Sequence, residues 1–272
     1  MKHVHPLSLA FVWALQGALT SCTPSLDVGD QAQVPDAGSP ATDVSLAMAD
    51  APGSAPPPAA CPGGNGNLPA RVLWLKLDGS ARDEVSGREG MVEGLPIAWD
   101  EGRFDRSLEL TGAENLSFGV SDAWRTLEEV QQVTMSAWIF VEALQPGYLG
   151  IITQSAPNSA VETVGLFLKD GFPTITVDFL GVSTPAPVPL GSWVHVAGVY
   201  ADRSLEVYVN GQPVAQQPTP FGIGSVDPEP ILVGANRNKG VVGERFSGRI
   251  DEISVFARAL SAAEIQALSC RP

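Results

Sequence analysis

Two runs of β-branched and aromatic residues, joined by turn residues, constrain the fold of this chain more than any other stretch. They lie in GSWVHVAGVYADRSLEVYVNGQPV, residues 191–214. Side chains alternate along residues 193–200 and again along 205–209, which is the period of two of a half-buried strand. Residues 201–204 are predicted to form one turn. Asn210-Gly211 predicts a type I′ turn, because both central positions of that turn need positive φ. The stretch therefore predicts a β-meander.

Further strand candidates follow at short intervals, with glycine and proline between them. They are residues 71–77, 107–110, 116–118, 133–141, 148–153, 161–168, 174–179, 231–234 and 246–256. Only residues 261–268 are typical of a helix, since Ser261 and Glu264 can form a capping box. Many short strands with one terminal helix predict an all-β fold, an antiparallel two-sheet sandwich.

The N-terminal residues resemble a bacterial lipoprotein signal. Lys2 precedes an apolar run over residues 7–19, which has the length of a signal h-region and is too short to span a bilayer. The run ends in Leu-Thr-Ser-Cys22, which resembles the lipobox, where the cysteine thiol receives a diacylglyceryl group. The resemblance implies a signal peptide over residues 1–21, a lipid anchor on Cys22 and a place in the bacterial cell envelope. Thr23 in place of aspartate favours the outer membrane. An ordinary secretory signal with an incidental cysteine is the alternative.

Residues 22–60 are predicted to be the lipidated cysteine and a disordered tether. From residue 23 to residue 60 there is no Lys, Arg or aromatic residue, while Pro, Ala and Asp recur. Such a segment cannot bury enough apolar surface to fold. As a flexible coil it would reach on the order of 35 Å. The folded domain is therefore assigned to residues 61–272.

The formal net charge of -14 argues against nucleic acid as a partner. Affinity for a phosphate backbone comes mainly from clustered Lys and Arg, and the sequence shows no basic patch. The membrane is expected to be contacted through the lipid anchor alone. The oligomeric state stays open.

Two cysteines remain after Cys22, namely Cys61 at the start of the domain and Cys270 close to its end. Two such thiols in an exported protein usually pair. The ends of compact domains often lie close together, so we predict a Cys61–Cys270 disulfide. In the chain-entropy model a loop of this length stabilises by roughly 4 to 5 kcal/mol. A free or metal-binding thiol is the alternative.

The meander and the segment FSGRIDEISVFARALSAAEIQAL after it are similar to the laminin-G-like family within the concanavalin A-like lectin/glucanase jelly rolls. LWLKLDGSARDEVSGREG, WDEGRFDRSLELTG and VTMSAWIFVE resemble earlier blocks of that family. The resemblance implies a two-sheet jelly-roll sandwich with one concave face. Relatives use this fold for glycan binding, for adhesion or as an accessory module of enzymes.

The resemblance also implies a calcium site. Asp78, Asp83 and Asp251 stand where related jelly rolls place calcium ligands. Calcium takes six to eight oxygens, so backbone carbonyls from glycine-rich loops would complete the set. A structural calcium ion is therefore expected as a cofactor. As the alternative, Asp78 and Asp83 are turn residues whose side chains bond the local backbone.

Candidate ligand contacts are aromatic rings outside the strand alternation and one polar loop. Trp124, in a predicted polar loop over residues 119–132, is expected to be exposed, and Tyr148 is a second candidate. Asn236, Arg237 and Asn238 form a polar loop that would offer hydrogen bonds to a sugar or would simply be a solvated hairpin tip. Tryptophans within strands, Trp193 among them, are expected in the core.

Catalysis is not expected. A retaining glucanase of this superfamily would carry Glu-x-Asp-x-x-Glu or the form one residue shorter, and neither occurs. His195 is the one histidine beyond the signal, and its place within a strand indicates a packed residue. We therefore expect a binding module, for glycan first, or for an extracellular or envelope protein as an adhesion or scaffold module. A glycan-cleaving enzyme is the remaining alternative.

Overall fold

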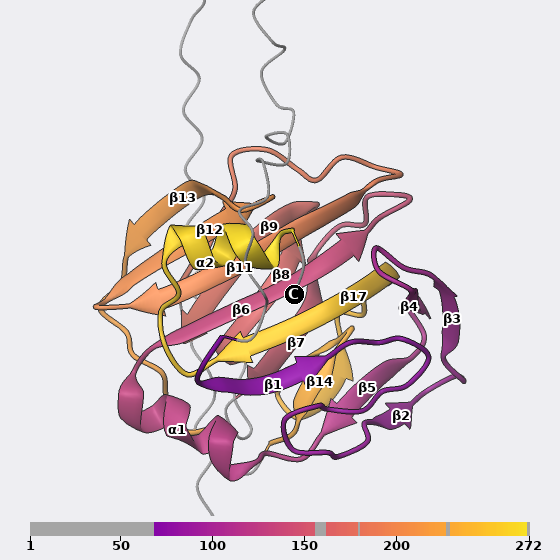
Figure 1. Ribbon diagram of the computed structural model, residues 1–272, viewed down its shortest axis with the longest axis horizontal. Helices are drawn as coiled ribbons and strands as arrows, with labels where there is room; N and C mark the ends of the chain where they lie inside the picture. Colours follow the sequence, from indigo (N-terminus) through magenta and orange to yellow (C-terminus); the bar gives the residue numbers. More distant parts are fainter. Residues whose placement is uncertain (1–67, 156–161, 179, 227–228, 271–272) are drawn as a thin grey trace, which may run out of the picture. The chain divides into compact units, whose positions relative to one another are not determined.

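The computed structural model describes most of the chain beyond the predicted tether (Figure 1). The described residues are 68–155, 162–178, 180–226 and 229–270. The predictions for the signal peptide, Cys22, the tether and Cys61 lie outside these residues. Neither helix of the described part has the length and apolar character to cross a lipid bilayer.

Eight strands form the first sheet. They are β1 (Arg71–Leu75), β3 (Ala98–Glu101), β4 (Arg106–Thr111), β6 (Val133–Phe140), β11 (Trp193–Ala201), β12 (Ser204–Val209), β13 (Gln212–Pro218) and β17 (Ser247–Phe256). Their order is β13-β12-β11-β6-β17-β4-β3, and β1 pairs with β17. Every pairing is antiparallel, so the sheet is a continuous ladder across the front of Figure 1.

Seven strands form the second sheet. They are β2 (Met91–Glu93), β5 (Asn115–Phe118), β7 (Tyr148–Ser155), β8 (Glu162–Lys169), β9 (Phe172–Asp178), β10 (Leu180–Ser183) and β14 (Ile231–Val233). Their order is β10-β9-β8-β7-β14-β5-β2, and the small hairpin of β15 (Asn236–Asn238) and β16 (Val241–Gly243) follows β14. The predicted all-β, antiparallel two-sheet sandwich is confirmed.

The main core lies between the two sheets. Strand β6 shows the alternation that builds it, because Met135 and Ile139 are fully buried in the core cluster. Trp138 and Phe140 are not members of that cluster and point to the outer face of the sheet. The outer face of the eight-stranded sheet therefore carries its own set of side chains.

The predicted meander is confirmed, with β11, β12 and β13 as consecutive antiparallel strands. Its first turn has positive φ at Asp202 and Arg203, of 49° and 60°. The Asn210-Gly211 turn has φ of 48° and 78°, as a type I′ turn requires. A Cβ on Gly211 would lie 2.6 Å from the Ser269 hydroxyl, so glycine also lets the C-terminal segment approach this turn.

Helix α2 (Ala262–Leu268) confirms the predicted C-terminal helix and its capping box. The Ser261 side chain accepts from the Glu264 N–H, and the Glu264 carboxylate accepts from the Ser261 N–H at 2.8 Å. Ile265 and Leu268 pack with Ala197 and Tyr208 on the outer face of the eight-stranded sheet. Figure 1 shows α2 lying across β11 and β12, so one part of that face is covered.

A second helix, α1 (Asp122–Val130), replaces the predicted polar loop over residues 119–132. Ser121 caps it by accepting from the Trp124 N–H at 3.1 Å. Trp124 and Leu127, three residues apart on one helix face, are fully buried. The loop prediction was wrong because two large apolar side chains were enough to dock a mostly polar helix.

Candidate functional site

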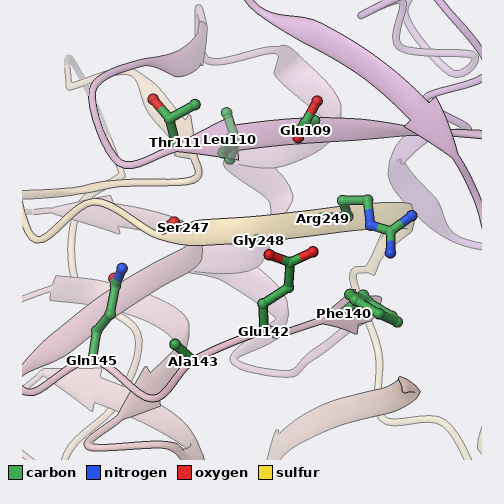
Figure 2. A pocket seen from close by; sticks show the side chains of 10 residues that line it. All are labelled: Glu109, Leu110, Thr111, Phe140, Glu142, Ala143, Gln145, Ser247, Gly248 and Arg249. Atoms are coloured by element: carbon green, nitrogen blue, oxygen red, sulfur yellow. The ribbon is translucent and has the colours of Figure 1, made fainter. Parts of the chain in front are cut away.

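The outer face of the eight-stranded sheet carries a hollow of about 290 Å³ (Figure 2). Strands β4 and β17, the end of β6 and the loop after β6 form it. Its lining residues are Glu109, Leu110, Thr111, Phe140, Glu142, Ala143, Gln145, Ser247, Gly248 and Arg249. No α2 residue lines the hollow, so it belongs to the part of the face that the helix leaves open.

Strand register places the main side chains of the hollow in one row. Glu109 of β4 pairs with Arg249 of β17, and Arg249 pairs with Phe140 of β6. Phe140 in turn pairs with Trp193 of β11. Residues paired across a sheet point to the same face, so the row crosses four neighbouring strands. Trp193 is half-buried on this outer face. The expectation that it lies in the core was therefore wrong.

Arg249 is fixed within this row by aromatic rings and by acceptors. Its guanidinium carbon lies 3.9 Å from the centre of the Phe140 ring and 5.7 Å from that of Trp193. Its Nη1 donates to the Asp100 carboxylate at 3.1 Å and to the Glu101 carbonyl oxygen at 3.0 Å. The arginine therefore braces Phe140 at the edge of the hollow, and its charge is balanced by Asp100.

Two carboxylates line the hollow from opposite sides of β17. Figure 2 shows the Glu142 side chain extending from the loop after β6 toward Gly248, while Glu109 projects from β4 beyond β17. Within the described part of the chain, neither carboxylate has a hydrogen-bond or ion-pair partner. The amide of Gln145 and the hydroxyls of Thr111 and Ser247 add neutral polar groups.

Gly248 supplies backbone in the middle of the hollow. Its φ is 140°, a conformation that side-chain-bearing residues rarely adopt. A Cβ there would also collide with the Phe140 carbonyl oxygen and approach the Phe246 ring at 3.1 Å. Only glycine fits at this point, so the segment Ser247–Arg249 can pass close beside the end of β6.

A second outer row lies beside the hollow and is closed by a loop. Asp251 of β17 pairs with Trp138 of β6, which pairs with His195 of β11. Phe104 packs edge-on against Trp138 with ring centres 6.2 Å apart, and the Arg103 guanidinium lies 4.7 Å from the Trp138 ring centre. Trp138 and His195 are consequently buried although they face outward.

Two acidic groups of β17 are buried at a bulge in this region. Burial raises the pKa of Asp251 to about 7, and the nearby negative charges of Glu252 and Asp78 raise it further. The Phe104 N–H acts against this rise, because it donates to the Asp251 Oδ2 at 3.0 Å. Burial also raises the pKa of Glu252 to about 7, although the Trp74 indole N–H donates to it at 3.0 Å. Both groups therefore exchange their proton close to neutral pH.

His195 does not fit a role in acid–base chemistry. Burial lowers its pKa to about 3, so the imidazole is neutral at physiological pH. The ring packs against Trp138 with centres 5.5 Å apart. The prediction that His195 is a packed strand residue is confirmed.

Comparison with known proteins identifies the family. A family model of laminin-G type, described as the concanavalin A-like lectin/glucanases superfamily, matches residues 113–266. The chain belongs to this superfamily. The match covers α1, the meander, all of β17 and most of α2, and it confirms the family resemblance found in the sequence. No curated protein matches the chain.

Solved structures share the fold of this superfamily member at low sequence identity. Domain 4 of the extracellular arabinanase AbnA from Geobacillus stearothermophilus, solved with arabinotriose, has a TM-score of 0.58 and 18% identity, over 73% of this chain and 98% of that domain. Trypanosoma rangeli sialidase has a TM-score of 0.56 and 20% identity, over 79% of this chain but 35% of the sialidase. The binding domain of botulinum neurotoxin DC, solved with rat synaptotagmin II, has a TM-score of 0.54 and 15% identity, over 74% and 51%. At sequence identities this low, the structural similarity shows that the fold is shared and nothing more.

The three aspartates of the predicted calcium site do not form one cation site in this lectin-like fold. Asp83 is 2% exposed, and its carboxylate accepts from the N–H groups of Trp74, Val85 and Ser86 and from the Ser86 hydroxyl. It therefore holds its own loop. Asp78 accepts from the Arg106 N–H at 3.3 Å.

No group of three His, Cys, Asp or Glu side chains within the described ranges is placed to hold a metal ion. Asp78, Asp83 and Asp251 thus do not fit a shared calcium site. Calcium binding by the protein stays a prediction.

Trp124 is not an exposed ligand contact. Its side chain is 0% exposed within the main core cluster, so its ring cannot stack on a sugar. The expectation of exposure rested on the wrong loop assignment of residues 119–132.

The other predicted ligand residues lie on the seven-stranded sheet and on the β15–β16 hairpin, and none of them lines the hollow. Tyr148 is half-buried at the start of β7, packed edge-on against Phe167 with ring centres 5.8 Å apart. Asn236 is 1% exposed and donates to Glu244 at 2.7 Å, which makes it a structural residue of the β15–β16 hairpin. Arg237 forms an ion pair with Glu229 at 3.4 Å, and Asn238 is exposed.

Cys270 is disulfide-bonded in the structure. Cys61 lies outside the described residues, so its pairing with Cys270 stays a prediction.

Proposed function

We propose that the protein is a cell-envelope binding module that holds a short glycan in the hollow between β4, β17 and the loop after β6. The observation that carries the proposal is the combination of the braced Phe140 ring with carboxylate, amide and hydroxyl side chains around one hollow. A sugar presents an apolar C–H face together with polar hydroxyls, so a site that binds it must combine an apolar ring with hydrogen-bonding side chains. The hollow is near the lower end of the usual range for ligand pockets, which suits a short oligosaccharide.

Two further observations support binding without bond cleavage. The arabinanase domain with the same fold was solved in complex with arabinotriose, which makes a sugar ligand compatible with this architecture. The sequence lacks the paired-carboxylate motif that a retaining glucanase of this superfamily would carry. The proposed ligand should therefore be recovered intact after incubation with the protein.

The test is an oligosaccharide binding screen followed by calorimetry on a Phe140→Ala variant. We expect Phe140→Ala to weaken the best ligand about tenfold or more, which corresponds to about 1.4 kcal/mol. Tyr148→Ala is the matched control, because Tyr148 is a half-buried aromatic of the opposite sheet. It should leave the affinity unchanged. Loss of binding in Tyr148→Ala with unchanged affinity in Phe140→Ala would place the ligand on the other sheet and contradict the proposal.

We also propose that the chain is displayed on the membrane surface through Cys22 and the tether. The support is the lipobox-like end of the N-terminal apolar run. Lipid-anchored proteins leave the membrane when the acyl-bearing thiol is removed, so Cys22→Ser should move the protein from the membrane fraction to the soluble fraction in a bacterial host. Continued sedimentation of Cys22→Ser with membranes would refute the anchor.

A protein partner is the second candidate, favoured by a separate surface. The edge strand β2 and the residues after it expose large apolar side chains, with Met91 66%, Val92 45% and Leu95 57% exposed. An edge strand with apolar side chains can accept a strand from another protein. The test is to measure partner binding by the Phe140→Ala variant and oxidation of Met91 in the complex. Unchanged binding of a partner protein by this variant, together with slower oxidation of Met91, would favour this candidate over glycan binding.

A further inference from the structure

We infer that the hollow selects glycans that carry a free primary amine, that is, deacetylated amino sugars, over N-acetylated and acidic sugars. The inference rests on the proposed function and specifies the ligand class of the same site. It follows from how the charges around the hollow are distributed and partnered.

Among the described residues that line the hollow, the one cation is already engaged. The Arg249 guanidinium donates to the Asp100 carboxylate at 3.1 Å and to the Glu101 carbonyl, and it stacks at 3.9 Å on Phe140. Its side chain is only 17% exposed. An acidic sugar would therefore have to break an existing ion pair before it could gain a new one.

The two anions of the hollow are, in contrast, unpartnered within the described residues. Glu109 and Glu142 have no hydrogen bond or ion pair, and they stand on opposite sides of β17 (Figure 2). A ligand ammonium has three donors and no acceptor, so it can donate to the carboxylate on either side of β17. Such charge-assisted hydrogen bonds are about twice as strong as neutral ones.

The remaining lining favours a sugar as the carrier of the amine. Gln145, Thr111 and Ser247 offer amide and hydroxyl groups around the same hollow, which match the hydroxyls of a pyranose ring. The Phe140 ring offers the apolar surface that the C–H face of a sugar covers. A lysine side chain would use the carboxylates but would make no use of the Phe140 ring or the Gln145 amide.

The charge of the whole chain acts in the same direction. A formal net charge of -14 attracts cationic ligands and repels uronic or sialic acids at distances beyond direct contact. This long-range contribution is screened by salt, with a Debye length of about 10 Å at 0.1 M ionic strength. Preference for an amino sugar should therefore weaken as salt is added.

The experiment is calorimetry of the full chain with three trimers of equal length at pH 6. The probes are β-1,4-linked glucosamine, β-1,4-linked N-acetylglucosamine and galacturonic acid, with a lysine tripeptide as a fourth probe. We expect the glucosamine trimer to bind about tenfold more tightly than the N-acetylated trimer at 50 mM salt, and the galacturonate trimer not to bind. Glu142→Gln and Glu109→Gln should each reduce the ratio of glucosamine-trimer to N-acetylated-trimer affinity several-fold. Glu129→Gln, at an exposed position of α1, is the matched control and should change nothing.

The outcomes separate the inference from the function on which it rests. If the N-acetylated trimer binds as tightly as glucosamine and Phe140→Ala abolishes both, glycan binding stands and the amino-sugar preference is overturned. If the lysine tripeptide matches the glucosamine trimer, the hollow recognises ammonium groups without a sugar, which also overturns it. If no saccharide binds, both the proposed function and this inference fail.

Discussion

Replacing Trp124 by alanine is expected to destabilise the domain by about 3–5 kcal/mol, the usual cost of deleting a fully buried tryptophan. The indole is 0% exposed and belongs to the main core cluster. Helix α1 has nine residues, too few to be stable in water by itself, so its docking depends on Trp124 and Leu127. For a domain of this size the loss corresponds to a fall in Tm of roughly 6–20 °C. Thermal and urea unfolding followed by circular dichroism will measure it.

Two matched variants make this prediction specific. Glu129→Ala changes an exposed residue of the same helix and should alter stability by no more than about 0.5 kcal/mol. Trp124→Phe should cost clearly less than Trp124→Ala, because it keeps most of the apolar volume. It also removes an indole N–H that is buried without a hydrogen-bond partner in the described structure. Equal stability of Trp124→Ala and the unmodified chain would show that α1 does not depend on this contact.

The sequence predicted the elements whose patterns are local. The meander, its two turns and the capping box of α2 followed from alternation and from Asn-Gly and Ser-x-x-Glu spacing. Helix α1 was missed because its residues are mostly polar and two apolar side chains give little periodicity. The sequence analysis missed five short strands, namely β2, β3, β10, β15 and β16. Their conformation depends on hydrogen bonds to neighbouring strands and is not marked by a pattern in their own residues. The segment Asn-Arg-Asn of β15 is an example.

The hollow could not be found from the sequence by the same reasoning. Its residues come from three segments far apart in the chain, around Glu109, Phe140 and Arg249, and only the register of β4, β17 and β6 brings them together. Alternation shows that Trp193 and Val194 face opposite sides of β11, but it does not tell which side is covered. Helix α2 covers one part of the outer face and leaves Trp193 beside the open part. The Gly-Arg-Ile-Asp segment was noticed for Asp251, whereas Arg249 is the residue that braces the hollow.

The stability of the domain is expected to fall as the pH rises from about 4 to about 7. Burial raises the pKa values of Asp251 and Glu252 to about 7 in the folded chain, above their ordinary values of 3.8 and 4.5. Within this window the unfolded chain releases protons that the folded chain keeps, so a higher pH favours unfolding. Glu264 acts in the opposite sense below pH 4.5, because the Arg258 guanidinium lowers its pKa to about 2. The maximum of stability set by these three groups should therefore lie near pH 4.

Asp251→Asn tests the origin of this dependence. The asparagine oxygen can still accept from the Phe104 N–H, which Asp251 does at 3.0 Å, but it carries no charge to bury. We expect the variant to have nearly the same Tm as the unmodified chain at pH 3.5 and a Tm about 3–8 °C higher at pH 8. Asp122→Asn, at a side chain that is 99% exposed, is the control and should shift neither value.

A lower Tm for Asp251→Asn at pH 8 would contradict the prediction, since it would mean that the ionised carboxylate stabilises the fold. Calcium distinguishes the two cases further. The Asp251 Oδ1 atom is buried without a partner in the described structure, so a cation bound there would favour the ionised carboxylate. If added calcium raises the Tm of the unmodified chain but not of Asp251→Asn, the Asp251 carboxylate is a calcium ligand. Its companions in that site would then be ligands other than the Asp78 and Asp83 pair. If calcium changes neither Tm, the raised pKa reflects a buried acid that is most stable with its proton.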